Sequence, residues 1–270
     1  MDWMKVLPQC ENEDVDFDQA REIRLRPFYP LYAQFPWGKW QGAHPLSPAE
    51  IETAAQALSG YALAAHGEQL AQGFLPLPGG HRLGIAGEMG PCGIRKIHSL
   101  CLRIAHEVKG CGQGIFSALQ GKHTLIIGPP GSGKTTLLRD LARLHALAGW
   151  QVGIADERGE IAACREGMPQ LDVGPLADVV SGMEKEKSLM MLIRAMAPQI
   201  LITDELGGKA DGRAVMEAIR CGVILLCTAH GRNIRDIACR PGIGAIVDRG
   251  IFEKTVLLSQ VGEQPQVEDL

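Results

Sequence analysis

The stretch GPPGSGKTT, residues 128–136, restricts the fold of this chain more than any other feature. It satisfies the pattern G-x-x-x-x-G-K-[ST] and lies between an apolar run, HTLIIG, and an amphipathic run, KTTLLRDLARLHALAG. The first run is typical of a buried strand and the second of a helix. Glycines in such a loop let backbone N–H groups point inward, where the helix N-terminus adds positive potential. The sequence therefore predicts a phosphate-binding loop, called the P-loop below, between a strand and a helix.

All residues of the P-loop are candidates for nucleotide binding, and two of them have specific roles. We expect Lys134 to reach the β- and γ-phosphates and the Thr135 hydroxyl to hold Mg²⁺. The predicted ligands are therefore ATP and Mg²⁺. The candidates are Gly128, Pro129, Pro130, Gly131, Ser132, Gly133, Lys134, Thr135 and Thr136.

Two carboxylates follow the apolar run QILITDE. A P-loop protein needs such groups at the edge of its sheet, and we expect Asp204 to bind the metal and Glu205 to activate the attacking water. The alternative is that the pair only begins a loop. A glutamate after the metal-binding aspartate favours water as the acceptor, so we interpret Glu205 as catalytic.

A second acidic cluster, IADERGE, follows the predicted strand after the P-loop helix. Such a strand lies near the phosphate site in doubly wound sheets. We expect one or two of its carboxylates to polarise water or assist Mg²⁺, with Asp156 as a metal candidate and Glu157 and Glu160 as catalytic candidates. The alternative is a solvated loop with a capping acid.

Alternation of strand and helix patterns predicts an α/β fold for residues 109–270. Further runs of strand length are QVGIAD, GVILLCTAH and GAIVD, and the helical patterns SLMMLIRAMA and DGRAVMEAIRCG separate several of them. This order favours a mainly parallel sheet covered by helices. The three glycines of KGCGQG, residues 109–114, predict a hinge before this domain. We interpret SGMEKEK, residues 181–187, as a solvated loop or a mobile element facing a pore.

Residues 1–108 have a different pattern and predict a small α+β N-terminal domain. Short strands and turns are indicated by RPFYPLYAQFPWGKWQGAHPLSP, and two strands joined by a Gly/Pro turn by HRLGIAGEMGPCGIRKIHSLCLRIAHE. Ser47, Pro48 and Glu50 form a predicted capping box. The helix after it is expected to run from Ala49 to about Ala71, with a break near Gly60.

Composition and charge argue against several classes of protein. The net charge of −4 over 270 residues gives no whole-molecule reason to expect nucleic acid or an anionic membrane surface. No run of eighteen apolar residues predicts a membrane span, and no apolar run at the start predicts a signal peptide. The eight cysteines form no C-x-x-C arrangement or zinc-ligand spacing. The protein is therefore expected to be cytoplasmic, with its cysteines reduced.

The order of these motifs resembles the secretion-ATPase branch of RecA-like P-loop NTPases, the hexameric ATPases of type II and type IV secretion and pilus retraction. The P-loop, DERGE, SLMMLIRAMAPQILITDE and GVILLCTAHG carry this resemblance. It implies that Arg194 is the arginine of the helix before the Asp204-Glu205 pair and that His230 belongs to a histidine box. It also implies an arginine contributed by a neighbouring subunit, for which the candidates are Arg82, Arg95, Arg103, Arg158, Arg165 and Arg194. The alternative for each of them is an ordinary surface or structural ion pair.

Within that branch the chain resembles the stage III sporulation protein AA family from about residue 20 to residue 250. The segments that carry the resemblance include EIRLRPFYPLY, HRLGIAGE, SLCLRIAHE and DERGEIAACREGMPQLDVGP. It implies an ATPase of the mother cell, peripheral at the cytoplasmic face of a membrane and associated with membrane-embedded sporulation channel proteins. Two departures are the Asp204-Glu205 pair, where secretion ATPases commonly have Gly-Glu, and LGGKAD, which lacks an arginine expected there.

The run LLCTAHGRN ends a predicted strand with Thr228 and His230. Because Glu205 already serves as the base, we interpret these two residues as a sensor of the γ-phosphate. A motor ATPase acting on a membrane complex is the favoured function. The alternatives are a RecA-like ATPase acting on nucleic acid, for which no basic tract or aromatic platform is present, a P-loop small-molecule kinase, and a nucleotide-gated scaffold with little turnover.

Overall fold

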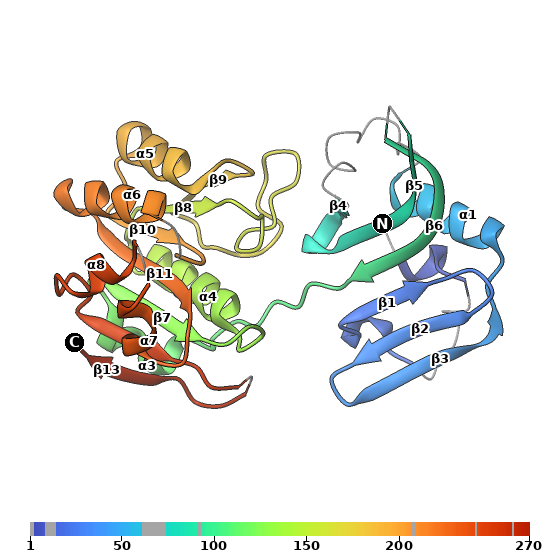
Figure 1. The fold of residues 1–270 in the computed structure, drawn as a ribbon, viewed down its shortest axis with the longest axis horizontal. Coiled ribbons are helices and arrows are strands. Elements are labelled where there is room, and N and C mark those ends of the chain that lie inside the picture. Colours follow the sequence, from blue (N-terminus) through green and yellow to red (C-terminus); the bar gives the residue numbers. More distant parts are fainter. Residues whose placement is uncertain are drawn as a thin grey trace. The chain divides into compact units, whose positions relative to one another are not determined.

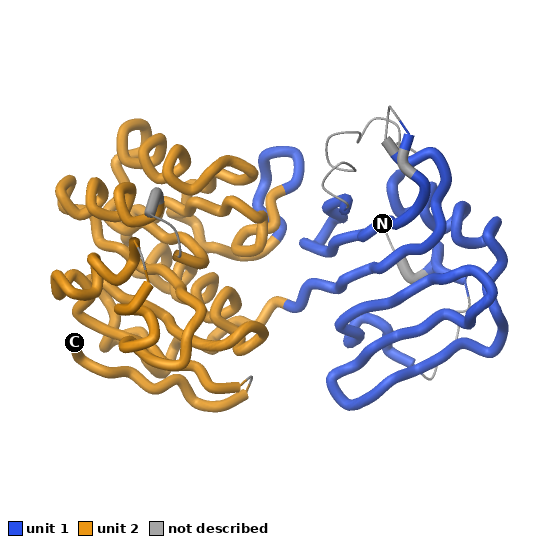
Figure 2. Tube along the Cα trace, viewed as in Figure 1, with its two compact units in different colours: residues 1–106, 165–170 blue, residues 107–164, 171–270 orange. Residues whose placement is uncertain are grey.

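The computed structural model describes residues 3–8, 15–60, 74–90, 93–206, 209–240, 242–260 and 262–270. The chain divides into two compact units, residues 1–106 with 165–170 and residues 107–164 with 171–270 (Figure 2). Each unit has its own sheet and its own hydrophobic core. None of the helices in the described ranges is long and apolar enough to cross a membrane.

The first unit contains a six-stranded antiparallel sheet in the order β3-β2-β1-β6-β5-β4 (Figure 1). Residues of β1 and β2 are alternately buried and half-buried, so one face of the sheet packs into the core with α1. The strands are β1 (Glu22–Leu25), β2 (Pro30–Phe35), β3 (Gly38–Pro45), β4 (Phe74–Pro76), β5 (Arg82–Gly90) and β6 (Gly93–Arg103), and the helical segments are η1 (Trp3–Val6), η2 (Phe17–Gln19), α1 (Pro48–Leu58) and η4 (Pro78–Gly80).

The predicted capping box begins α1. The Glu50 N–H donates to Ser47 Oγ at 3.3 Å, and Glu50 Oε2 accepts from the Ser47 N–H at 2.7 Å. The helix ends at Leu58, before Gly60 with its φ of +65°. The continuation of this helix to Ala71 was also predicted, but residues 61–73 lie outside the described residues.

The second unit is an α/β structure with a seven-stranded sheet in the order β13-β12-β7-β11-β10-β8-β9. All described pairings are parallel except that of β12 with the edge strand β13. The strands are β7 (Thr124–Gly128), β8 (Val152–Asp156), β9 (Ala177–Ser181), β10 (Ile200–Thr203), β11 (Ile224–His230), β12 (Lys254–Leu257) and β13 (Gln266–Asp269); the helices are α3 (Gln113–Leu119), α4 (Lys134–Leu147), α5 (Lys185–Met196), α6 (Lys209–Arg220), α7 (Ile234–Ala238) and α8 (Gly244–Val247).

Helices cover both faces of this sheet, as expected for buried parallel strands (Figure 1). Leu125 and Ile127 of β7 pack in one core cluster with residues of α5 to α8, whereas Ile126 packs in another with residues of α3 and α4. Successive side chains of a strand point to opposite faces, so a continuous apolar strand supplies both clusters. The predicted fold class, a mainly parallel sheet covered by helices after a small α+β domain, is confirmed.

Two local predictions are wrong. The run GAIVD does not form a strand, because its residues lie in the short helix α8, and a Cβ on Gly244 would lie 2.1 Å from the Ala238 carbonyl oxygen of α7. Only glycine permits this close approach, and a four-residue apolar run does not distinguish strand from helix. The segment 181–187 is also only partly a loop, since α5 already begins at Lys185.

Candidate functional site

The carboxyl ends of three neighbouring strands bring the predicted functional groups to one edge of the second sheet. The central strand β11 lies between β7, which leads into the P-loop, and β10, which leads to Asp204 and Glu205. His230, at the end of β11, is in register with Gly128 at the end of β7. Since parallel strands share their carboxyl edge, the P-loop, the histidine and the carboxylates meet there.

The P-loop wraps around its own lysine. Gly131 and Gly133 have φ values of +75° and +93°, a left-handed conformation that glycine adopts without strain. Lys134, the first residue of α4, is only 6% exposed, and its Nζ donates to the carbonyl oxygens of Gly128 at 2.9 Å and Pro129 at 2.7 Å. Burial lowers the pKa of Lys134 from its ordinary value. The lysine is therefore held inside the loop by the loop's own backbone.

The P-loop fits a phosphate ligand. A Cβ on Gly128 would lie 2.5 Å from Ser132 Oγ and 2.7 Å from the Leu258 carbonyl oxygen, so glycine is required there. Beside Gly131 and Gly133, by contrast, there is open space. The buried Ser132 hydroxyl has no hydrogen-bond partner among the described residues. Because buried polar groups are normally hydrogen-bonded, this hydroxyl is available to donate to a ligand oxygen.

The remaining P-loop residues line the loop's outer side and the start of α4. Pro129 and Pro130 are exposed, and Thr135 and Thr136 in the first turn of α4 are half-buried. The Thr135 side chain is therefore accessible to a ligand at the helix N-terminus, where a predicted metal-binding hydroxyl must lie.

His230 connects the P-loop lysine with Glu205. Its Nδ1 lies 3.1 Å from Lys134 Nζ, and its Nε2 lies 3.2 Å from Glu205 Oε1. An ammonium group only donates, so we assign the acceptor role to Nδ1, and a neutral ring then carries its proton on Nε2 and donates it to Glu205. Arg158 pairs with the other carboxylate oxygen of Glu205. The carboxylate is thus held between a histidine and an arginine.

The backbone of Glu205 is held on both sides in an unusual conformation. Its φ is +43°, which is uncommon for a residue with a side chain. The Glu205 N–H donates to Thr228 Oγ1 at 2.8 Å, and the Glu205 carbonyl accepts from Lys185 Nζ at 2.8 Å. The Thr228 carbonyl also accepts from the Leu206 N–H at 2.8 Å. Thr228, interpreted from the sequence as a phosphate sensor, therefore holds the turn that carries Glu205.

Asp204 is buried beside Lys185. Burial raises the pKa of Asp204 to about 6, and the Lys185 ammonium acts in the opposite direction. Asp156 and Glu160 raise it further, because their charges repel that of Asp204. A carboxylate in such surroundings favours a nearby cation, as expected of a metal ligand.

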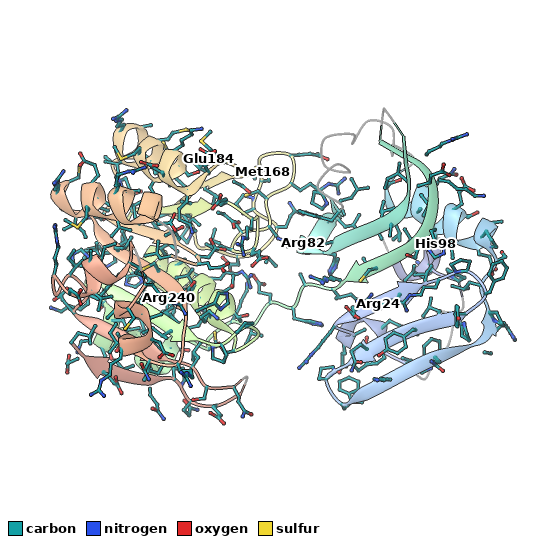
Figure 3. The ribbon with its side chains drawn as sticks, viewed as in Figure 1. Arg24, Arg82, His98, Met168, Glu184 and Arg240 are labelled. Carbon is teal, nitrogen blue, oxygen red and sulfur yellow. The ribbon has the colours of Figure 1, made fainter. Side chains whose placement is uncertain are left out.

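Lys185 was not predicted as a site residue. It is 6% exposed, whereas Glu184, which is labelled in Figure 3, and Lys187 are exposed. These two pair with each other at 2.7 Å. Three of the four residues 184–187 are exposed or half-buried, which agrees with the solvated stretch that the local sequence indicates. The one available signal is its helical spacing, because Lys185 lies four residues before Leu189, the first buried apolar residue of the predicted helix, and therefore on the same face.

Asp156 organises the acidic loop. Its Oδ1 accepts from the N–H groups of Glu160 at 2.8 Å and Ile161 at 3.1 Å, and its Oδ2 accepts from that of Ala162 at 2.9 Å. The Arg139 guanidinium, from α4, donates to the carbonyls of Glu160 and Ile161. This geometry favours the alternative of a capping acid over a metal ligand, because both carboxylate oxygens of Asp156 already accept backbone hydrogen bonds.

Three predicted catalytic residues differ in their placement. Glu160 is half-buried and close enough to Asp204 to affect its pKa. Glu157 is exposed at the start of the acidic loop. Arg194 is exposed near the end of α5, nine residues and therefore roughly 14 Å along the helix from Lys185. The structure thus brings Glu160 toward the site but does not bring Arg194 into it.

Among the residues that the structure describes, no three His, Cys, Asp or Glu side chains gather to hold a metal ion by themselves. Mg²⁺ in phosphate-transfer sites is commonly held by one or two protein oxygens together with phosphates and water. The Thr135 hydroxyl and Asp204 are oxygen donors of this kind.

Comparison with known proteins identifies relatives of the whole chain. Residues 4–270 match the model of a protein family described as sporulation stage III, protein AA. The stage III sporulation protein AA of Bacillus subtilis (strain 168) is 39% identical over 216 residues, which cover 75% of this chain and 70% of that protein.

Solved structures with the same fold include an ATPase and a pilus retraction motor. The ATPase DotB of Legionella pneumophila superposes with a TM-score of 0.63 at 15% identity, covering 89% of this chain and 72% of DotB. The pilus retraction motor PilT with bound ADP superposes with a TM-score of 0.59 at 14% identity, covering 92% of this chain and 77% of PilT. At these identities the likeness is one of fold, and the fold is that of the RecA-like secretion ATPases.

Proposed function

The chain belongs to the sporulation stage III protein AA family, and from that membership and the geometry of the sheet edge we propose that it is an ATP hydrolase of the secretion-ATPase type. The observation that carries the proposal is the chain of contacts from Lys134 through His230 to Glu205. It joins a phosphate-binding lysine to a carboxylate suited to orienting water. A loop that only bound a nucleotide would not require this connection.

The P-loop would bind the phosphates of ATP. Its backbone N–H groups, the unpartnered Ser132 hydroxyl and the Lys134 ammonium are the donors for them. Thr135 and Asp204 would hold Mg²⁺, which neutralises charge on the phosphate oxygens when it is bound. Lys134 would exchange its present acceptors, the carbonyls of Gly128 and Pro129, for phosphate oxygens.

Glu205 would orient the attacking water and accept its proton. His230 holds one oxygen of this carboxylate through Nε2 and contacts Lys134 through Nδ1, so a change at the lysine is transmitted to the base. His230 is accordingly proposed as a sensor. Glu160, half-buried at the acidic loop, adds negative charge near Asp204.

The cellular process that ATP hydrolysis would drive is inferred from the family and the fold. The family name places the chain in sporulation, and DotB and PilT are an ATPase and a pilus retraction motor with the same fold. We propose a homo-hexamer, peripheral at the cytoplasmic face of a mother-cell membrane, that powers or regulates assembly of, or transport through, a sporulation-associated channel complex. Sizing with and without a non-hydrolysable ATP analogue tests the hexamer, which a nucleotide-independent monomer would contradict.

The Glu205→Gln variant tests the catalytic assignment. Glutamine keeps the size of the side chain but accepts no proton, so we expect ATP affinity within about threefold of wild type and turnover lower by roughly 100-fold or more. Calorimetric titration and phosphate release measure the two quantities. Loss of ATP binding instead would mean that Glu205 is structural. Stimulation of the wild type by single-stranded DNA or by small hydroxylated acceptors would favour the nucleic-acid or kinase alternatives.

A further inference from the structure

Lys185 is one of two buried lysines among the described residues, and the only one of the two outside the P-loop. Burying an ammonium group is unfavourable unless it has hydrogen-bond and charge partners. The partner that the structure gives Lys185 is the carbonyl oxygen of Glu205, 2.8 Å from its Nζ. The lysine therefore ends on the backbone of the residue proposed to orient water.

The hydrogen bond from Lys185 is matched by one on the other side of Glu205. The Glu205 N–H belongs to the peptide unit before the residue and donates to Thr228 Oγ1, whereas its carbonyl belongs to the peptide unit after it and accepts from Lys185. Both peptide units are thus fixed by side chains. Between them Glu205 keeps its φ of +43°, a conformation that persists only where its surroundings enforce it.

This backbone conformation determines where the carboxylate lies. Glu205 Oε1 is 3.2 Å from His230 Nε2, and the other oxygen pairs with Arg158. Rotation of either flanking peptide would move the carboxylate away from both partners. Lys185 and Thr228 come from α5 and β11, so two separate elements hold one catalytic side chain in place.

We propose that Lys185 is a positioning residue for Glu205. Its hydrogen bond to the Glu205 carbonyl, opposite the bond from the Glu205 amide to Thr228, fixes the backbone that aims the carboxylate. Lys185 does not contact the reacting atoms itself in this arrangement. The inference rests on the proposed ATP hydrolysis and assigns a further residue to that site.

Lys185→Met tests the proposal, because methionine fills similar space but donates no hydrogen bond. We expect kcat to fall roughly 10- to 100-fold, since small displacements of a catalytic group have effects of this size, with the KM for ATP within about threefold. Lys187→Met is the matched control, an exposed lysine of the same helix, and its kcat should equal that of the wild type. Lys185→Arg, which restores a charged donor, should recover most of the lost rate.

A double-mutant cycle separates positioning of Glu205 from other roles of Lys185. If the lysine acts through Glu205, adding Lys185→Met to Glu205→Gln should change kcat by less than about threefold. The alternative is that the Lys185 ammonium acts on the charge of Asp204. Removal of Lys185 would then change the binding of Mg²⁺ and ATP equally in the wild-type and Glu205→Gln backgrounds. Titration with a non-hydrolysable ATP analogue and Mg²⁺ measures that binding without turnover.

The outcomes are distinct. An unchanged kcat in Lys185→Met, or the same loss of rate in the wild-type and Glu205→Gln backgrounds, would overturn the positioning role while leaving the proposed function intact. A wild-type protein without ATP turnover would overturn the proposed function, and the positioning role with it. If Lys185→Met does not fold, Lys185→Arg decides, because the positioning role requires near-wild-type kcat from it.

Discussion

His230 occupies the central position among the functional side chains. One ring nitrogen contacts Lys134 and the other contacts Glu205, at 3.1 Å and 3.2 Å. Lys134 is the group proposed to meet the γ-phosphate, and Glu205 is the group proposed to orient water. The histidine is therefore suited to reporting the state of the first to the second.

His230→Ala should separate ATP binding from its structural consequence. We expect ATP affinity within about threefold of wild type, because the P-loop remains intact, and turnover roughly tenfold lower, because Glu205 loses one of its two side-chain partners. Hydrogen exchange measures the response: ATP should protect the amides of residues 204–206 in wild type but not in the variant. His98→Ala, an exposed histidine of β6, is the control (Figure 3). Unchanged protection in His230→Ala would contradict the sensor role.

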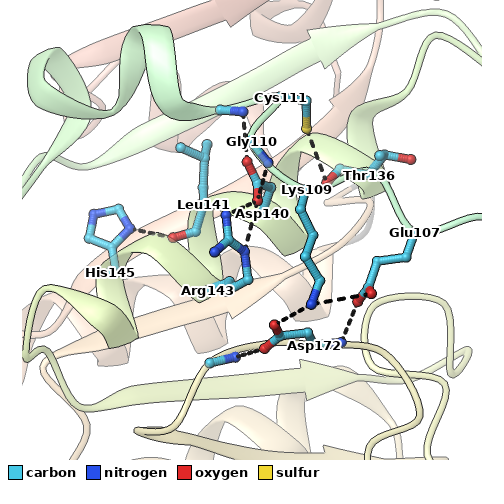
Figure 4. A network of polar contacts seen from close by, with 12 residues as sticks. Glu107, Lys109, Gly110, Cys111, Thr136, Asp140, Leu141, Arg143, His145 and Asp172 are labelled. Atoms are coloured by element: carbon cyan, nitrogen blue, oxygen red, sulfur yellow. Dashed lines mark hydrogen bonds and ion pairs between the residues drawn. The ribbon is translucent and has the colours of Figure 1, made fainter.

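Helix α4 connects three parts of the second unit. It begins with Lys134 of the P-loop, its Arg139 holds the acidic loop, and its Asp140 holds the segment that precedes α3. Asp140 Oδ1 accepts from the Gly110 N–H at 3.0 Å and Oδ2 from the Gly112 N–H at 2.8 Å, with the Arg143 guanidinium on Oδ1 (Figure 4). The predicted hinge 109–114 is thus anchored to the helix that carries the P-loop lysine.

The glycines of this segment allow close approach and turning. Gly110 has a φ of +84°, and a Cβ on Gly112 would lie 3.0 Å from Leu141 Cδ2 of α4. Their abundance suggested flexibility from the sequence. The structure gives a different physical reason for them, because a larger residue at Gly112 would press against α4.

Asp140→Asn should destabilise the protein in a pH-dependent way. Burial raises the pKa of Asp140, but the hydrogen bonds from Gly112 and Gly110 and the Arg143 guanidinium outweigh it, so the pKa lies below its ordinary value of 3.8. A lowered folded-state pKa means that the carboxylate stabilises the fold fully above about pH 4 and loses this effect as pH falls through the lower value.

At pH 7 we therefore expect the variant to lose roughly 1–3 kcal/mol of unfolding free energy, and less as the pH falls below 4. Urea unfolding at several pH values measures this, with the exposed Asp248→Asn as control. A loss that stays constant from pH 7 to pH 3 would contradict the assignment of the effect to the charged carboxylate.

The elements that could be predicted from the sequence are those with a continuous apolar run or a strong helical period. Uniform apolar runs indicated β7, β8, β10 and β11, and the helical periods indicated α4, α5 and α6. The role of Lys185 could not be predicted, because helical spacing indicates only which face it shares, whereas its burial depends on the packing of α5 against β8. The acidic cluster has two roles in the structure: Asp156 caps backbone N–H groups, and Glu160 places charge near Asp204. Both roles likewise depend on how the acidic loop folds back, which the sequence pattern does not indicate.

At the scale of the whole molecule, the family and the fold together support the proposed function. Membership in the sporulation stage III protein AA family identifies the process, and the likeness to DotB and PilT identifies the RecA-like secretion-ATPase fold. The central claim, that this chain hydrolyses ATP at the P-loop edge, therefore depends on Lys134, whose ammonium is proposed to bind the phosphates.

The most direct test is the rate of phosphate release from Mg²⁺ and ATP by the wild type and by Lys134→Ala. We predict continuous turnover by the wild type and a rate at least about 100-fold lower in the variant, because the loop loses its one buried cation. Equal rates in the two proteins, or a wild-type rate no higher than that of a solution without protein, would contradict the claim.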